Sequence, residues 1–109
     1  MTIQGLTDAL ALTVFNLDEP DRPVTGGYCG DLLSWVMGRA VAGGAWLTIM
    51  SNVNVAAVAA LADVACVILT EGVQPDPPLL ERAKAQGIAL LGTELSTYDC
   101  AVRLGKLIG

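Results

Sequence analysis

The sequence predicts a single α/β domain, with a mostly parallel sheet of about five strands flanked by helices. Two apolar runs, Ala45–Met50 and Cys66–Thr70, show no polar alternation, a pattern typical of strands that are covered on both faces. Between them lie a polar break at Ser51, Asn52 and Asn54 and an Ala/Val-rich segment that favours a helix. A strand, a helix and a strand in this order predict a parallel pair joined by a right-handed crossover.

Length and composition fit one domain over residues 1–109, large enough to bury a core without disulfides or metals. Apolar residues make up 53% of the chain and aromatic residues only 5%, so the core has to be built mainly from Ala, Val, Leu and Ile. A small protein this apolar often hides part of its surface in a partner, and we therefore expect a homodimer.

The charge pattern argues against nucleic acids and membranes as partners. The net charge is −5 and the six basic residues form no run, whereas phosphate backbones and anionic lipids are bound by clustered Lys and Arg. The uncharged stretch between Arg39 and Asp63 is long enough to cross a bilayer. It would place the amides of Asn52 and Asn54 near mid-membrane, so a soluble core is the better interpretation. The N-terminus, with no basic cluster, is not that of a signal peptide.

Three cysteines, Cys29, Cys66 and Cys100, occur without a CxxC pair and without any histidine in the chain. An odd number of thiols, one of them in a predicted core strand, indicates reduced cysteines and a cytoplasmic protein. Tetrahedral metal sites use closely spaced Cys and His ligands. We therefore expect no metal and no cofactor.

The chain before the central unit is predicted to begin with a helix over Thr2–Leu10, capped by Thr2 and followed by a strand at Leu12–Phe15. Asn16–Pro23 holds two prolines among acidic residues and is expected to be a solvated loop. Val24–Gly30 should start as a strand and become a glycine-rich turn.

A second helix is expected to start at Asp31, with Asp31 as its cap and the Gly43-Gly44 pair at its end. Trp35 lies off the apolar stripe of this helix. It either packs over the helix edge or anchors a partner. The expected stripe consists of Leu32, Leu33, Val36 and Met37.

The last third of the chain is expected to alternate helix, strand and helix. Glu71–Pro78 is expected to form a turn that ends in a helix start, with Asp76 as the cap and two prolines in the first turn. This helix should bury Leu79, Leu80 and Ala83 and stop at Gly87. The remaining elements are a strand at Ile88–Leu91, a capping box at Ser96–Asp99, and a final helix that buries Ala101, Leu104 and Leu107.

No catalytic residues stand out. Without histidine the chain lacks the commonest general base at neutral pH. It also has no GxxxxGK[ST] and no GxGxxG, and its eleven acidic residues form no DxD motif. We therefore expect a protein that is not an enzyme.

The predicted ligand site is the carboxyl edge of the parallel sheet, where loops after the strands form crevices. Ser51, Asn52, Asn54 and Thr70 would offer hydrogen bonds to a polar ligand, while Ser51 or Asn52 could equally be a helix cap. Glu71 would repel a phosphate unless it turns outward. Gly72 lets its backbone come close to a ligand.

Nearly the whole chain resembles the DRTGG domain family. The resemblance implies a fold similar to the N-terminal domain of HPr kinase/phosphorylase and a regulatory role, as in CBS-containing pyrophosphatases. The phosphoryl-transfer machinery of that kinase sits in a separate P-loop domain that this chain lacks. The stretches that carry the resemblance are VTGGYCGDLLSWVMGRA, GAWLTIMSNVNVAAVAALADVACVILTEG, PDPPLLERAKAQGIALL and STYDCAVRLGKL.

The family is named for an Asp-Arg pair after one strand and Thr-Gly-Gly after the next. By position the pair falls on 51–54, where Asp-Arg is absent, and the triplet on 70–72, where Glu71 replaces the first glycine. The earlier Thr25-Gly26-Gly27 has the same letters as the triplet, and we include Gly26 and Gly27 among the ligand-binding candidates.

Together these observations predict a non-enzymatic regulatory or sensory domain that binds a small polar or nucleotide-like ligand at the carboxyl edge. The alternative is a dimeric interaction adaptor without a small ligand, with Trp35 at its interface. Stand-alone members of the family that this chain resembles commonly accompany signalling and iron–hydrogenase genes, and for the adaptor the resemblance implies an accessory role there. An enzyme of unrecognised type is the third hypothesis.

Overall fold

The computed structural model describes residues 1–108. Five helices and five strands form within these residues. In chain order the elements are α1 (Ile3–Ala9), β1 (Thr13–Asn16), β2 (Gly27–Cys29), α2 (Leu33–Arg39), β3 (Ala45–Thr48), α3 (Asn54–Ala62), β4 (Cys66–Leu69), α4 (Pro77–Gln86), β5 (Leu90–Gly92) and α5 (Thr97–Ile108).

The described strands form one mixed, mostly parallel sheet in the order β1-β5-β4-β3-β2. β3 and β4 pair in parallel, with Ala45 opposite Cys66 and Thr48 opposite Leu69. β2 and β5 continue the sheet in parallel on either side, and β1 closes one end antiparallel to β5. The predicted fold class and the central parallel pair are therefore confirmed.

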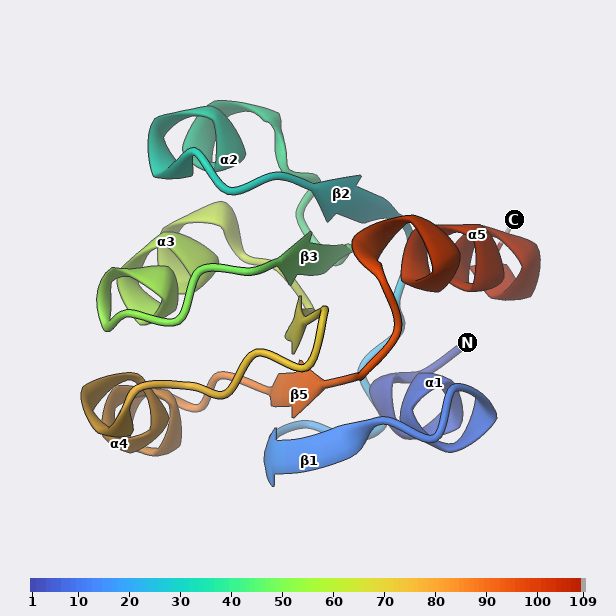
Figure 1. The fold of residues 1–109 in the computed structure, drawn as a ribbon, viewed down its shortest axis with the longest axis horizontal. Helices are drawn as coiled ribbons and strands as arrows, with labels where there is room; N and C mark the ends of the chain where they lie inside the picture. Colours follow the sequence, from blue (N-terminus) through green and yellow to red (C-terminus); the bar gives the residue numbers. More distant parts are fainter. Residues whose placement is uncertain (109) are drawn as a thin grey trace.

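Helices cover both faces of the sheet, which Figure 1 shows as two layers with the strands between them. Helices α2, α3 and α4 lie on one face and α1 and α5 on the other. All residues of β3 and β4 are buried, because alternate side chains enter the two apolar layers. This burial explains why both segments are continuous apolar runs in the sequence.

Trp46 is the largest fully buried side chain and belongs to the layer beneath α2, α3 and α4. Its indole N–H donates to the carbonyl oxygen of Gly30 at 2.9 Å. A buried indole therefore keeps its hydrogen bond, and the bond fixes the backbone where β2 ends.

The segment around β2 differs from the prediction. β2 begins at Gly27, so Gly26 and Gly27 lie at the start of the strand and not in a turn after it. α2 begins at Leu33, and its N-cap residue, Leu32, makes no side-chain capping bond. The Asp31 cap was wrong, because the Asp31 carboxylate is engaged with β3. Of the expected stripe only Val36 is fully buried, while Leu32 and Met37 are exposed.

Several local predictions are confirmed. Thr2 caps α1 by accepting from the Gly5 N–H at 3.0 Å. Of the predicted capping box one half is present: the Ser96 hydroxyl accepts from the Asp99 N–H at 3.0 Å, whereas the Asp99 carboxylate makes no hydrogen bond to the Ser96 backbone. Gly87 ends α4 with a φ of 69°, a left-handed conformation that glycine adopts without a steric cost. Asp76 is the N-cap residue of α4, but its side chain makes no capping bond.

Two predictions near the C-terminus were wrong in detail. β5 spans Leu90–Gly92 instead of Ile88–Leu91. Leu107 is exposed, whereas α5 buries Cys100 and Leu104 and packs Ile108 against the same core. Residues 100, 104 and 108 share one side of the helix, and Leu107 does not lie among them. None of the helices within residues 1–108 combines the length and apolar character needed to cross a lipid bilayer.

Candidate functional site

The carboxyl ends of β2, β3, β4 and β5 share one edge of the sheet, because these strands are parallel. Six of the predicted ligand residues lie at this edge, five in the loops after β3 and β4 and one, Asn54, at the start of α3. The N-termini of α2, α3, α4 and α5 lie there as well, since each helix follows one of the four strands. The candidate site therefore combines polar loops with helix starts.

Ser51 and Asn52 connect β3 with α3 and have different partners. The Ser51 hydroxyl donates to Asp76 Oδ1 at 3.2 Å, and the Ser51 carbonyl accepts from the Asp76 N–H at 2.9 Å. This double contact ties the loop to the start of α4. Asn52 Oδ1 accepts from the N–H of Asn54, the first residue of α3, at 2.9 Å. Asn52 therefore supports the helix start, Ser51 does not, and the Asn54 side chain is exposed.

The loop after β4 is paired with the loop after β5. The Glu71 N–H donates to the Leu95 carbonyl at 2.8 Å, and the Gly72 N–H donates to the Thr93 carbonyl at 2.9 Å. A Cβ at Gly72 would meet only the carboxylate end of Glu94, a side chain that can move aside. Gly72 has a φ of 74°, so the left-handed backbone of this loop is what favours glycine at position 72.

Thr70 and Glu71 both reach the first residue of α5. Thr70 is fully buried, and its hydroxyl lies 2.6 Å from the hydroxyl of Thr97. Glu71 Oε2 accepts from the Thr97 N–H at 2.9 Å. Thr70 is thus satisfied inside the protein, and Glu71 turns toward α5.

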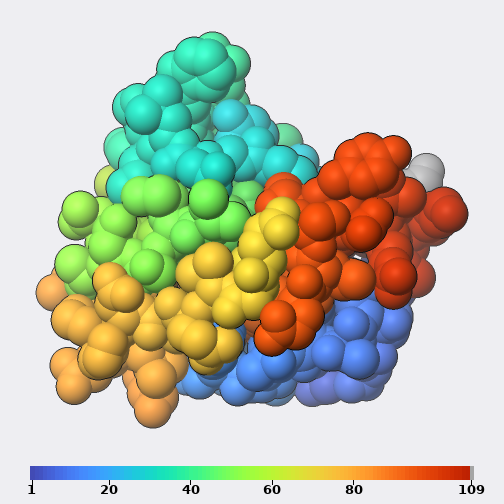
Figure 2. Space-filling model, viewed as in Figure 1, coloured from blue at the N-terminus to red at the C-terminus, as the bar shows by residue number. Residues whose placement is uncertain are grey.

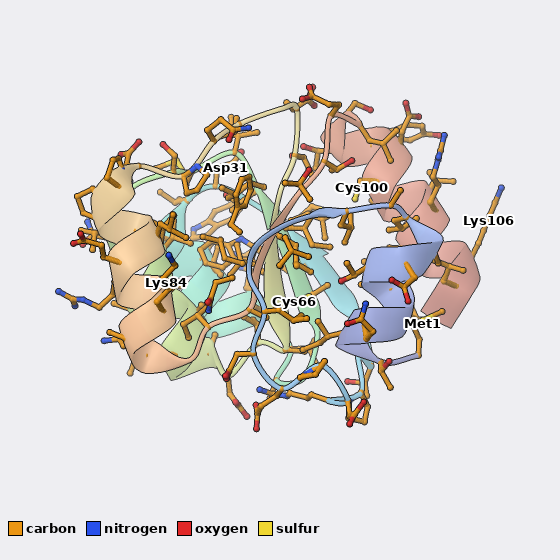
Figure 3. The ribbon with its side chains drawn as sticks, turned by 90° about the horizontal axis from the view of Figure 1, so that it is seen from below. Met1, Asp31, Cys66, Lys84, Cys100 and Lys106 are labelled. Atoms are coloured by element: carbon orange, nitrogen blue, oxygen red, sulfur yellow. The ribbon has the colours of Figure 1, made fainter. Side chains whose placement is uncertain are left out.

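Asp31 is a site residue that the sequence analysis assigned to another role. Its Oδ1 accepts from the Thr48 hydroxyl at 2.8 Å and from the Ile49 N–H at 3.0 Å. The carboxylate therefore joins the ends of β2 and β3 at the candidate site, and Figure 3 shows Asp31 at the end of the sheet away from Met1. The signal in the sequence was a polar residue just after a strand, which is a common position for a site residue. Using that signal required knowing where β2 ends.

The carboxyl edge is acidic. Five of the eleven acidic residues lie in its loops or in the first turns of its helices, and no Lys or Arg among residues 1–108 does. The basic residues lie in the middle or last turn of a helix, or, for Arg22, in the loop before β2. The acidic residues of this edge are Asp31, Glu71, Asp76, Glu94 and Asp99.

Gly26 and Gly27 lie at the amino end of β2, on the opposite edge of the sheet from the other candidates. The Gly26 carbonyl accepts from the Ala45 N–H at 2.9 Å. A Cβ at Gly27 would lie 2.9 Å from Leu104 Cδ2. Gly27 therefore lets α5 lie close to β2, whereas a Cβ at Gly26 would meet no neighbouring atom. The structure does not bring either glycine to the other six residues.

The three thiols are not activated as nucleophiles. Burial raises the pKa of Cys66 to about 12 and that of Cys100 to about 11. The pKa of Cys29 is also raised, mainly by partial burial and to a smaller extent by the negative charge of Asp31. A reactive cysteine needs the opposite shift. Within residues 1–108, no three His, Cys, Asp or Glu side chains are grouped so as to hold a metal ion.

A cavity of about 240 Å³ lies at the amino edge, between the loop before β2 and the ends of α3 and α4. Arg22 lines it and donates to the Asp63 carbonyl at 2.9 Å, to Asp63 Oδ1 at 3.1 Å and to the Val64 carbonyl at 3.4 Å. The lining holds none of the predicted ligand residues. The Arg22 contacts hold the loop against the C-terminus of α3, which favours cations.

Trp35 is 52% exposed on α2. The guanidinium of Arg39 lies 3.8 Å from the centre of its ring, a cation–π contact one turn along the helix. Leu32, Met37 and Val41 are also exposed on or beside α2, and Figure 2 shows α2 standing out from the body of the molecule. The structure therefore gives this helix an apolar outer surface.

Among solved structures, the fold is similar to that of the CBS and DRTGG domains of the regulatory region of Clostridium perfringens pyrophosphatase. That crystal structure contains the activator diadenosine tetraphosphate. The TM-score is 0.75 at 16% sequence identity, and the match covers 94% of this chain and 45% of that one. This chain thus spans less than half of that region, and the likeness concerns the fold. No curated protein matches the chain.

The sequence model of the DRTGG domain matches residues 39–107. This range is more than half of the chain, and it contains β3, β4 and β5 with the loops that form the carboxyl edge. The match confirms the resemblance found in the sequence motifs. The chain belongs to the DRTGG domain family.

Proposed function

We propose that this chain is a non-enzymatic regulatory or sensory domain that binds a small polar or nucleotide-like ligand at the carboxyl edge of its sheet. The observation that carries the proposal is that the loop after β3 is joined to the start of α4 through Ser51, and the loop after β4 to the start of α5 through Thr70 and Glu71. A ligand that contacts these loops would alter the way the helices are held. The regulatory region of the pyrophosphatase, bound to its nucleotide activator, supports a regulatory role.

The test is thermal melting of the purified chain against a panel of metabolites. A bound ligand at a hundred times its dissociation constant adds about 2.7 kcal/mol to the free energy of unfolding, so the melting temperature should rise. Asn54→Ala should reduce that rise, because Asn54 is exposed at the edge. Gln86→Ala, on the opposite edge, is the matched control and should keep it. A panel without any shift would remove the ligand-binding function.

The second candidate function is a dimeric, cytoplasmic adaptor that works through protein contacts. The exposed apolar surface of α2 around Trp35 favours it, since aromatic residues in the centre of an interface often dominate binding. The two functions can also be combined in one chain, with α2 at the dimer interface and the ligand at the carboxyl edge.

A further inference from the structure

We propose that Glu71 determines which ligands the carboxyl edge accepts: its carboxylate occupies the anion position at the start of α5 and excludes phosphate groups. The edge is then left for neutral or cationic ligands, or for the base and sugar of a nucleotide-like ligand whose phosphates lie away from α5. The inference rests on the proposed function, because it names the chemical class of ligand for the same site.

The first observation is the contact itself. Glu71 Oε2 lies 2.9 Å from the backbone nitrogen of Thr97, the first residue of the twelve-residue helix α5. The N–H groups of a first helical turn have no partner within the helix and attract anions. In α5 the Thr97 N–H is taken by Glu71 and the Asp99 N–H by the hydroxyl of Ser96. Oxygens of the chain itself therefore occupy two of the donors that a phosphate would use.

The second observation is that the backbone around Glu71 is held in place. Hydrogen bonds from the Glu71 and Gly72 N–H groups to Leu95 and Thr93 fix this loop beside the start of α5. Glu71 has a φ of 60°, in the left-handed region that glycine adopts at less cost than other residues. The glutamate is therefore present despite an unfavourable backbone conformation, and its side chain is anchored within reach of Thr97.

The third observation is the charge of the surroundings. The carboxylate of Glu94 lies next to Gly72. Within residues 1–108, no Lys or Arg lies in the loops or helix starts of this edge to balance its acidic residues. A phosphate would have to displace a carboxylate that is tethered to the site and would then meet further like charges. A neutral or cationic group meets neither obstacle.

The test titrates inorganic pyrophosphate into the isotope-labelled chain and follows the Thr97 amide by NMR, with calorimetry for affinity. An ionic strength of about 0.01 M keeps the Debye length near about 30 Å, so that surface charges are not screened. The variants are Glu71→Gly, which removes the side chain and relaxes the backbone, and Glu71→Gln, which keeps an acceptor for Thr97 without the charge. Glu81→Gln, on an exposed position of α4, changes the net charge equally and is the control.

We expect the Thr97 resonance of the wild type and of Glu81→Gln to stay in place. In at least one Glu71 variant the Thr97 resonance should shift as pyrophosphate is added, and the affinity for pyrophosphate should be about tenfold or more above that of the wild type. Wild-type binding that shifts Thr97, or no gain in either Glu71 variant, would overturn the assignment. A flat metabolite panel would instead remove the proposed function and leave this titration unaffected, because pyrophosphate alone is its probe.

Discussion

At the scale of single residues, Cys66 and Cys100 show how the environment changes a side chain without giving it a reaction. Both are buried on the face of the sheet that α1 and α5 cover. Burial in apolar surroundings disfavours the thiolate, which is the reactive form of cysteine. Their part in the protein is therefore to fill the core.

The raised pKa values predict a loss of stability at alkaline pH. The folded chain keeps the Cys66 proton up to about pH 12, whereas an ordinary thiol loses it near 9.0. Above about pH 9 the unfolded state binds fewer protons than the folded state, so the free energy of unfolding falls as pH rises. Each buried thiol contributes a slope of up to about 1.4 kcal/mol per pH unit.

Urea denaturation between pH 7 and 11 measures this slope. Stability linked to the thiols should be constant below pH 8 and decline above pH 9, and Cys66→Ala should decline less steeply than the wild type. The comparison uses slopes because the substitution also removes packing contacts. Identical slopes in both proteins would show that Cys66 is not the titrating group.

At the scale of secondary-structure elements, α2 differs from its neighbours. Helices α3, α4 and α5 each bury at least two residues, whereas α2 buries only Val36. It also packs beside β2, which is an edge strand of the sheet. An apolar helix over an open edge is a region where another chain can attach.

Trp35→Ala is expected to lower the oligomeric mass of the chain or remove a partner from pull-down, with little change in helicity. The loss in unfolding free energy should be about 1 kcal/mol or less, since the side chain is half-exposed and its main described contact is the cation–π pair with Arg39. Light scattering after size exclusion gives the mass. Tyr98→Ala, which truncates an exposed aromatic residue on α5, is the control. If Trp35→Ala leaves both mass and partners unchanged, the tryptophan is an ordinary surface residue.

At the scale of the whole molecule, stability depends on enclosing the sheet between two helical layers. Val58 is 6% exposed and lies in the layer of α2, α3 and α4. Val58→Asp would bury a carboxylate without a partner, at a cost of several kcal/mol. That cost is a large part of the about 5–15 kcal/mol that stabilises a typical domain.

We therefore expect Val58→Asp to unfold the chain, as seen by circular dichroism and by the loss of a cooperative urea transition. Ala57→Asp, on the exposed side of the same helix, should remain folded. A Val58→Asp protein with the native spectrum and transition would contradict the burial of α3.

The sequence by itself determined the central unit of the fold. Ala45–Met50 and Cys66–Thr70 lack polar alternation because both faces of β3 and β4, which they contain, are covered, and this property can be recognised from each segment alone. The same local logic located Thr2, Gly87 and Ser96 at helix ends, since a cap involves residues only a few positions apart.

Only the tertiary structure decided which polar groups meet at the carboxyl edge. Asp31 serves β3 instead of its own helix, and Glu71 reaches Thr97 across 26 positions. Gly26 and Gly27 lie at the other edge, because β2 starts where the sequence had indicated a turn. These partnerships depend on which strand ends become neighbours and on strand boundaries to within a residue, and neither is encoded in the local pattern.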